Sequence, residues 1–118
     1  IYSNKATISG GAIFNIGING TIYANTLRSN NAQNYGGAIN NWNGVNTRIT
    51  GNNITYNNAT YGGAINTRAI NTTITENIIT RNSAVRGGAI LDTRYTTTTM
   101  NNNTIKNNPT ENGEEVTH

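Results

Sequence analysis

Hydrophobic and polar residues recur along this chain with a fixed period. The tetrapeptide Gly-Gly-Ala-Ile occurs at Gly10–Ile13, Gly36–Ile39, Gly62–Ile65 and Gly87–Ile90, so its copies start 26, 26 and 25 residues apart. Self-similarity with a period of about 20 to 50 residues is typical of solenoids and other repeat arrays. We therefore expect each period to form one structural unit, which we call a coil.

A second pattern of apolar and polar positions lies between the copies of the tetrapeptide. It reads apolar, two residues, Asn, one residue, apolar, two residues, Asn, and one copy comprises Ile49, Asn52, Ile54 and Asn57. The other copies begin at Ile22, Ile74 and Met100. The two patterns alternate along the chain, so a coil contains one copy of each.

The pattern predicts short strands and no helices. The apolar residues do not recur at the i, i+3, i+4, i+7 spacing of a helix, whereas Ile, Thr and Tyr are enriched and favour strands. In the second coil we expect strands of roughly 3–5 residues near Gly37–Asn40, Thr47–Thr50 and Asn53–Tyr56. Insertions and deletions fall around Trp42 and Arg68 and just before each Gly-Gly pair, which predicts variable loops at those places.

Equivalent strands from successive coils should stack into parallel sheets. Neighbouring strands lie about 4.8 Å apart, and parallel crossovers are almost always right-handed. We predict an all-β fold, a right-handed parallel β-helix over residues 1–118 with about four to five coils of 25–26 residues. The chain opens inside a repeat, so we expect a segment of a longer repeat protein, in which 107–118 form a polar tail or a weak cap. Open strand edges recruit other chains, which also predicts end-to-end self-association.

Asparagines at fixed offsets predict two hydrogen-bonded columns. A side-chain amide both donates and accepts, so an Asn above another Asn can bond along the stack, as in cross-β ladders. The first column comprises Asn4, Asn30, Asn57, Asn82 and Asn108, and the second comprises Asn25, Asn52, Asn77 and Asn103. The Gly-Gly pair is expected to supply a positive φ or room for a tight corner.

The paired motifs resemble a known family of repeats. Gly-Gly-Ala-Ile combined with Leu27–Asn30, Ile54–Asn57, Ile79–Asn82 and Ile105–Asn108 resembles the GGA[ILV] and FxxN repeats of chlamydial polymorphic membrane proteins, and similar repeats occur in adhesin-like surface proteins of methanogenic archaea. Ile or Leu stands here where the family has Phe. The resemblance implies a pectin-lyase-like β-helix in an extracellular cell-surface protein with an adhesive role. It also implies a partner that is a protein or glycan of a host cell or a neighbouring cell.

The acidic residues give little support to an enzyme. Asp92 and Glu76 share no repeat offset, and Glu111, Glu114 and Glu115 gather near the end of the chain. No column therefore pairs two carboxylates for glycoside hydrolysis or collects several for calcium binding. We expect no catalytic residue, no metal site and no cofactor. The alternative is a carbohydrate-binding or accessory β-helix segment of a carbohydrate-active enzyme whose catalytic groups lie elsewhere.

Composition argues against three further classes of function. The chain has 118 residues, a net charge of +3 and no cysteine. Its eight Lys and Arg residues spread over several repeat offsets, whereas a nucleic-acid site clusters them on one face. No apolar run approaches the roughly 18 residues of a membrane span. The columns of Thr that ice binding needs are interrupted by Tyr23, Arg28 and Lys106.

Tyr35, Tyr61 and Arg86 form the first candidate binding feature. They precede the Gly-Gly pair in successive coils, so they should stack as a ladder. Such a ladder either binds a ligand or has a purely structural role, in which mutual packing and cation–π contact contribute about 0.5–1 kcal/mol.

The second candidate feature is the variable loop expected to carry Trp42, Arg68 and Arg94. Exposed loops on a rigid scaffold often carry recognition, and an aromatic ring beside arginines suits a sugar face or an anionic polymer. The structural alternative is a loop that folds Trp42 over a thin core.

Overall fold

The computed structural model describes residues 1–93 and 97–117. Over these residues the chain forms short strands joined by turns and contains no helix. The strands are β1 (Lys5–Ala6), β2 (Ile13–Asn15), β3 (Thr21–Tyr23), β4 (Thr26–Arg28), β5 (Asn31–Ala32), β6 (Ile39–Val45), β7 (Arg48–Thr50), β8 (Asn53–Thr55), β9 (Ile65–Ile70), β10 (Thr73–Thr75), β11 (Ile78–Thr80), β12 (Ile90–Asp92), β13 (Thr99–Asn101), β14 (Thr104–Lys106) and β15 (Val116–Thr117). None of the described residues belongs to a helix long and apolar enough to cross a bilayer.

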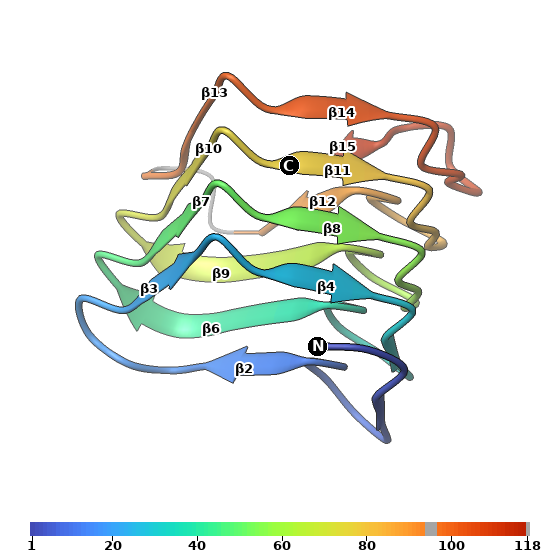
Figure 1. The fold of residues 1–118 in the computed structure, drawn as a ribbon, viewed down its shortest axis with the longest axis horizontal. Helices are drawn as coiled ribbons and strands as arrows, with labels where there is room; N and C mark the ends of the chain where they lie inside the picture. Colours follow the sequence, from blue (N-terminus) through green and yellow to red (C-terminus); the bar gives the residue numbers. More distant parts are fainter. Residues whose placement is uncertain (94–96, 118) are drawn as a thin grey trace.

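The strands stack into parallel sheets, so the predicted parallel β-helix is confirmed. The sheet orders are β1-β5, β13-β10-β7-β3, β14-β11-β8-β4 and β15-β12-β9-β6-β2. In Figure 1 the chain climbs from the N-terminus at the bottom, with β4 and β8 running to the right in front and β6 and β9 running to the left behind them. This sense of winding is right-handed, as expected.

One of the three strands expected in the second coil is misplaced. β7 and β8 lie close to their predicted positions, but the strand expected at Gly37–Asn40 is β6, which begins at Ile39 and continues to Val45. The Gly-Gly pair makes the corner, so pairing starts only after it. The strand then runs through a position that we expected to be a loop. A shift in register between Trp42 and Val45 absorbs the one extra residue of this coil as a β-bulge, with Asn43 at a φ of 55°.

The two glycines of each Gly-Gly pair have different roles. The first glycine takes a positive φ, 65° at Gly36 and 66° at Gly62, which L side chains rarely adopt. The second glycine has no room for a side chain, because a Cβ on Gly63 would collide with the carbonyl oxygen of Gly88 and lie 2.5 Å from that of Ser83. The expected positive φ is therefore found at the first glycine, and the expected need for space at a tight corner is found at the second.

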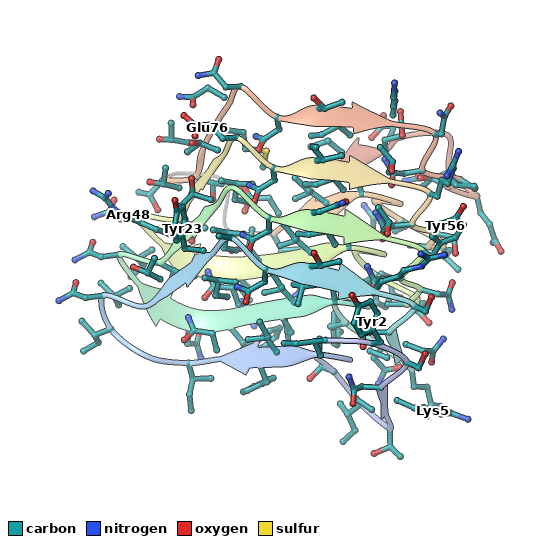
Figure 2. All side chains as sticks on the ribbon, viewed as in Figure 1. Tyr2, Lys5, Tyr23, Arg48, Tyr56 and Glu76 are labelled. Atoms are coloured by element: carbon teal, nitrogen blue, oxygen red, sulfur yellow. The ribbon has the colours of Figure 1, made fainter. Side chains whose placement is uncertain are left out.

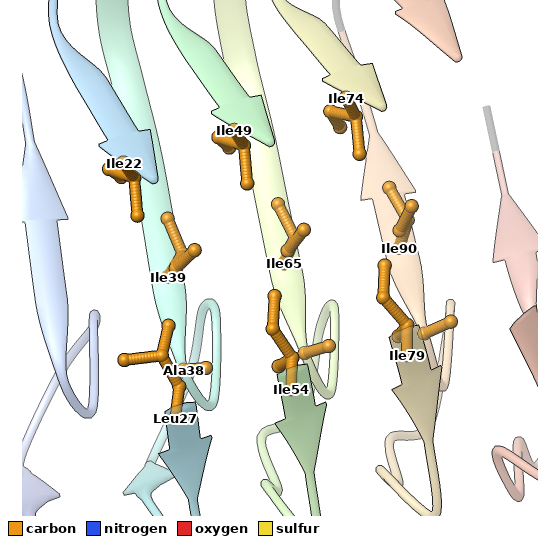
Figure 3. Close-up of a cluster of buried hydrophobic side chains, with 12 residues drawn as sticks. Ile22, Leu27, Ala38, Ile39, Ile49, Ile54, Ile65, Ile74, Ile79 and Ile90 are labelled. Carbon is orange, nitrogen blue, oxygen red and sulfur yellow. The ribbon is translucent and has the colours of Figure 1, made fainter. Parts of the chain in front are cut away.

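The core consists of apolar columns that run along the solenoid axis. Figure 3 shows these side chains stacked from coil to coil. The fully buried members are Leu27, Ile54 and Ile79 in one column, Ile49 and Ile74 in another, and Ile39, Ile65 and Ile90 in a third. The alanine of Gly-Gly-Ala-Ile is also fully buried at Ala38, Ala64 and Ala89. One or two buried apolar residues per strand therefore suffice, because each is covered by neighbouring coils.

The two predicted asparagine columns are confirmed. Each asparagine except the last of its column donates through its main-chain N–H and its side-chain amide to Oδ1 of the asparagine in the next coil. The main-chain nitrogen and Nδ2 of Asn57 each lie 2.9 Å from Oδ1 of Asn82. The contacts repeat through Asn4, Asn30, Asn57, Asn82 and Asn108, and through Asn25, Asn52, Asn77 and Asn103.

A third buried polar column was not predicted. Asn15 donates through Nδ2 to Oδ1 of Asn41 at 2.8 Å, and Asn41 donates to Thr72 at 3.0 Å and to Thr67 at 3.2 Å. Asn41 and Thr67 occupy the same offset after Gly-Gly-Ala-Ile in successive coils. The repeat pattern did not predict this column, because its members are a mixture of Asn and Thr and not asparagine in every coil.

Candidate functional site

The outer face of the sheet β15-β12-β9-β6-β2 carries two of the six candidate binding residues, Trp42 and Arg68. Side chains alternate along a strand, so Ile39 and Asn41 of β6 are buried while Trp42 lies half-exposed on the outer face. In β9, Thr67 is buried and Arg68 is exposed on that same outer face. A hydrogen-bonded sheet therefore holds both candidate side chains in fixed positions.

Trp42 and Arg68 contact each other across neighbouring strands. They are register partners in β6 and β9, and the guanidinium carbon of Arg68 lies 4.8 Å from the centroid of the indole. The expectation that they belong to a variable loop is wrong, because the bulge after Trp42 absorbs the length difference within paired strands. Arg94, the third residue of that expected loop, lies outside the described residues.

Tyr35 and Tyr61 stack as the sequence predicts. Their ring centroids are 5.2 Å apart with an angle of 24° between the rings, and their backbones form a parallel bridge. Arg86 follows in the same column, bridged to Tyr61, with an exposed side chain. The three residues therefore occupy one column along the solenoid axis, and the stacked pair of side chains within it is Tyr35 and Tyr61.

The structure joins the two candidate features into one surface. The ring of Tyr35 lies 5.8 Å from that of Trp42, at an angle of 51°. We call the combined surface the aromatic–arginine strip, and define it as Tyr35, Trp42, Tyr61, Arg68 and Arg86. The strip spans three successive coils, because Tyr35, Tyr61 and Arg86 occupy equivalent positions one coil apart.

An apolar hollow lies at the N-terminal edge of the strip. It has a volume of about 170 Å³ and is lined by Ile8, Ser9, Phe14, Tyr35, Asn40 and Trp42. Phe14 is 50% exposed and shares its register position with Asn40 of the next coil. The sequence analysis missed Phe14, although it directly follows Gly-Gly-Ala-Ile and so must lie on the outer face.

The strip combines two chemical abilities. Aromatic faces pack against the apolar faces of sugar rings, and the ring of Trp42 is fixed by Arg68 and Tyr35. A guanidinium offers a planar set of donors that matches a carboxylate or a sulfate, and Arg68 and Arg86 are both exposed. The surface is therefore suited to a sugar that carries negative charge.

A second aromatic–arginine cluster lies at another corner of the coil and was not predicted. The guanidinium carbons of Arg28 and Arg81 lie 5.1 and 5.5 Å from the ring centroid of Tyr56, and Nη1 of Arg81 donates to its hydroxyl oxygen at 2.9 Å. Tyr56 and Arg81 share a repeat offset, which is a signal the sequence does contain. This cluster has a single aromatic ring, which is 46% exposed, whereas the strip has three rings.

A groove lined by both polar and apolar residues runs along the solenoid beside this corner. It has a volume of about 590 Å³, and its lining includes Asn31, Asn58 and Ser83, which occupy one column. Glu111 is the one carboxylate among the lining residues. Within residues 1–93 and 97–117, no three His, Cys, Asp or Glu side chains gather closely enough to hold a metal ion.

No protein-family model, curated protein or solved structure matches this chain. The function is therefore inferred from the residues of the strip and from the repeat motifs.

Proposed function

We propose that this chain is a non-enzymatic, adhesive segment of an extracellular cell-surface protein. It binds a glycan or protein on a host cell or a neighbouring cell through the aromatic–arginine strip. The observation that carries the proposal is the contact of Trp42 with both Arg68 and Tyr35, which makes one continuous surface of two separate columns. The resemblance of the motifs to adhesin-like repeats supports the location and the adhesive role.

The chemistry of the strip favours an acidic glycan among such partners. A pyranose ring placed against Trp42 and Tyr35 brings its substituents toward the exposed side chains of Arg68 and Arg86. Hydrogen bonds from a guanidinium to an anionic group are roughly twice as strong as those between neutral groups. A uronate or a sulfated sugar therefore satisfies both halves of the surface.

A carbohydrate-binding segment of a carbohydrate-active enzyme is the second candidate. The observation that favours it is the groove, in which the column formed by Asn31, Asn58 and Ser83 offers two amides and a hydroxyl to an extended chain. The two proposals place the ligand on different faces, so substitutions distinguish them.

The test measures binding of the purified chain to an array of neutral and acidic glycans and to intact cells. We expect Trp42→Ala and Arg68→Ala each to weaken binding to an acidic glycan by about tenfold, which corresponds to about 1.4 kcal/mol. Tyr23→Ala and Arg48→Ala are matched controls, because both side chains are exposed on the β3–β7 face (Figure 2). Unchanged binding by the Trp42 and Arg68 variants contradicts the proposal. A loss confined to Asn58→Ala and Ser83→Ala supports the enzyme-associated candidate.

A further inference from the structure

The last described residues follow the path of the Gly-Gly-Ala-Ile motif. Val116 pairs in register with Ile90. The main-chain carbonyl oxygen of Glu115 accepts the N–H groups of Ala89 and Ile90 at 2.9 and 3.0 Å. In the preceding coils an alanine accepts these bonds, as Ala89 does from Ala64 and Ile65. Gly113 keeps the positive φ of the first glycine, at 85°. The motif is therefore present once more as Gly113–Val116, with Glu114 and Glu115 in place of the second glycine and the alanine.

The carboxylate of Glu115 takes the hydrogen bonds that a further coil would make. Its Oε1 atom accepts the main-chain N–H of Asn108 at 2.6 Å and the side-chain amide of Asn108 at 2.9 Å. One coil earlier, Oδ1 of Asn108 accepts the same two groups of Asn82 at 2.9 and 3.0 Å. Glu115 therefore occupies the place of the next asparagine and ends this column.

Glu114 puts a side chain where the next coil would pass. A Cβ on Gly88, the equivalent position one coil earlier, would lie 2.6 and 2.7 Å from the carbonyl oxygens of Pro109 and Asn108. These atoms belong to the following coil, as do the atoms that a Cβ on Gly63 would meet. A side chain at this position and a following coil exclude each other, and Glu114 carries an exposed side chain there.

The N-terminal end of the solenoid differs from the C-terminal end. Asn4 and Asn25 donate to the coil that follows them, and their Oδ1 atoms face away from it as acceptors for a preceding coil. Seven of the eleven exposed large apolar side chains of the described residues lie at this end, and these seven are Ile1, Tyr2, Ile8, Phe14, Ile16, Ile18 and Tyr23. Lys5 lies in this first coil, opposite in charge to Glu111 and Glu114 of the last.

We propose that Glu114 and Glu115 form a stop that prevents a further coil from stacking on the C-terminal end of this solenoid. A solenoid of the same repeat type that carries Gly and Ala at these two positions keeps its C-terminal end open to the N-terminal face of a coil such as the first one described here. End-to-end association is then one-sided: a copy with both glutamates docks onto such an open end but receives no neighbour on its own C-terminal end. This inference does not depend on the proposed adhesive function.

The experiment restores the repeat motif in this chain. In Glu114→Gly/Glu115→Ala the second glycine frees the path of the next coil and the loss of the carboxylate frees the donors of Asn108. Sedimentation velocity is expected to show discrete oligomers that grow with concentration, at a dissociation constant at least tenfold below that of the unaltered chain. Added unaltered chain is expected to shorten these oligomers, because its N-terminal end docks and its C-terminal end blocks growth.

Two further variants separate the stop from other causes. Glu114→Gln/Glu115→Gln removes the same charges but keeps a side chain and an amide oxygen in place, so it is expected to sediment like the unaltered chain. Glu114→Gly alone keeps the hydrogen bonds that hold Asn108, and it is expected to associate more weakly than the double variant. If the double variant loses the circular dichroism spectrum of the folded chain, Glu114→Gly alone is used in its place.

Three results overturn the proposal. The first is a folded Gly-containing variant that sediments like the unaltered chain. The second is a glutamine variant that associates as strongly as the Gly/Ala variant, because charge repulsion then explains the effect. The third is an unaltered chain that forms the same oligomers as the Gly/Ala variant.

Discussion

Oδ1 of Asn57 accepts both the main-chain N–H of Asn30, at 2.8 Å, and its side-chain amide, at 3.1 Å. The amide of Asn57 in turn donates to Asn82 and to the carbonyl oxygen of Leu27 at 3.0 Å. Asn57 is 1% exposed, so water cannot replace these partners. Chains of hydrogen bonds in a medium of low dielectric strengthen one another, and an unpaired member is costly. The column therefore stabilises this fold together with its apolar core.

Asn57→Ala is expected to lower the free energy of unfolding by about 3 kcal/mol, because it leaves buried donors of Asn30 and the carbonyl of Leu27 unpaired. Denaturation with urea measures the change. Asn58→Ala is the matched control, since Asn58 is exposed and surface substitutions cost about 0.5 kcal/mol or less. Equal effects of the two substitutions would contradict the role assigned to the column.

Gly63→Ala is expected to lower the free energy of unfolding by about 3 kcal/mol or more, because its Cβ collides with backbone atoms of the next coil and overpacking forces the coils apart. Thermal unfolding followed by circular dichroism is a suitable measurement. Gly17→Ala is the control, because the nearest atom to its Cβ is Oδ1 of Asn15 at 3.4 Å and its φ is not positive. That variant should unfold at a temperature close to that of the unaltered chain.

Ile79→Ala and Ile78→Ala test the inward and outward faces of one strand. Ile79 is fully buried and Ile78 is 47% exposed. Removing the buried side chain is expected to cost about 2–5 kcal/mol, whereas the exposed neighbour should cost about 1 kcal/mol or less. Urea denaturation of both variants provides the comparison, and a larger loss at Ile78 would show that the register of β11 is wrong.

Tyr35 and Tyr61 should be energetically coupled. Their stacked rings predict a coupling free energy of about 0.5–1.5 kcal/mol in a double-mutant cycle of the alanine variants. The free energies of unfolding of the two single variants and the double variant give this value. Additive losses would indicate that the rings lie near each other without stabilising the fold.

The period of the motifs predicts most of the fold, because it acts through simple geometry. Residues one period apart occupy equivalent positions in successive coils, so Asn30 and Asn57 must face each other once the coils stack. The same reasoning predicts the ladder of Tyr35 and Tyr61. It is less successful where the period is irregular, as at Trp42, because length differences can be absorbed either in a loop or in a β-bulge.

The amino-acid sequence by itself determined the contacts that run along the solenoid axis, since these join residues at equal offsets. Only the tertiary structure decided the contacts within a coil, because they depend on how sharply the chain turns at each corner. The turn at Gly36 and Gly37 brings Tyr35 beside Trp42, and the path after Pro109 brings Glu115 onto Asn108. Neither pair has a repeat offset in common, so the period contains no information about them.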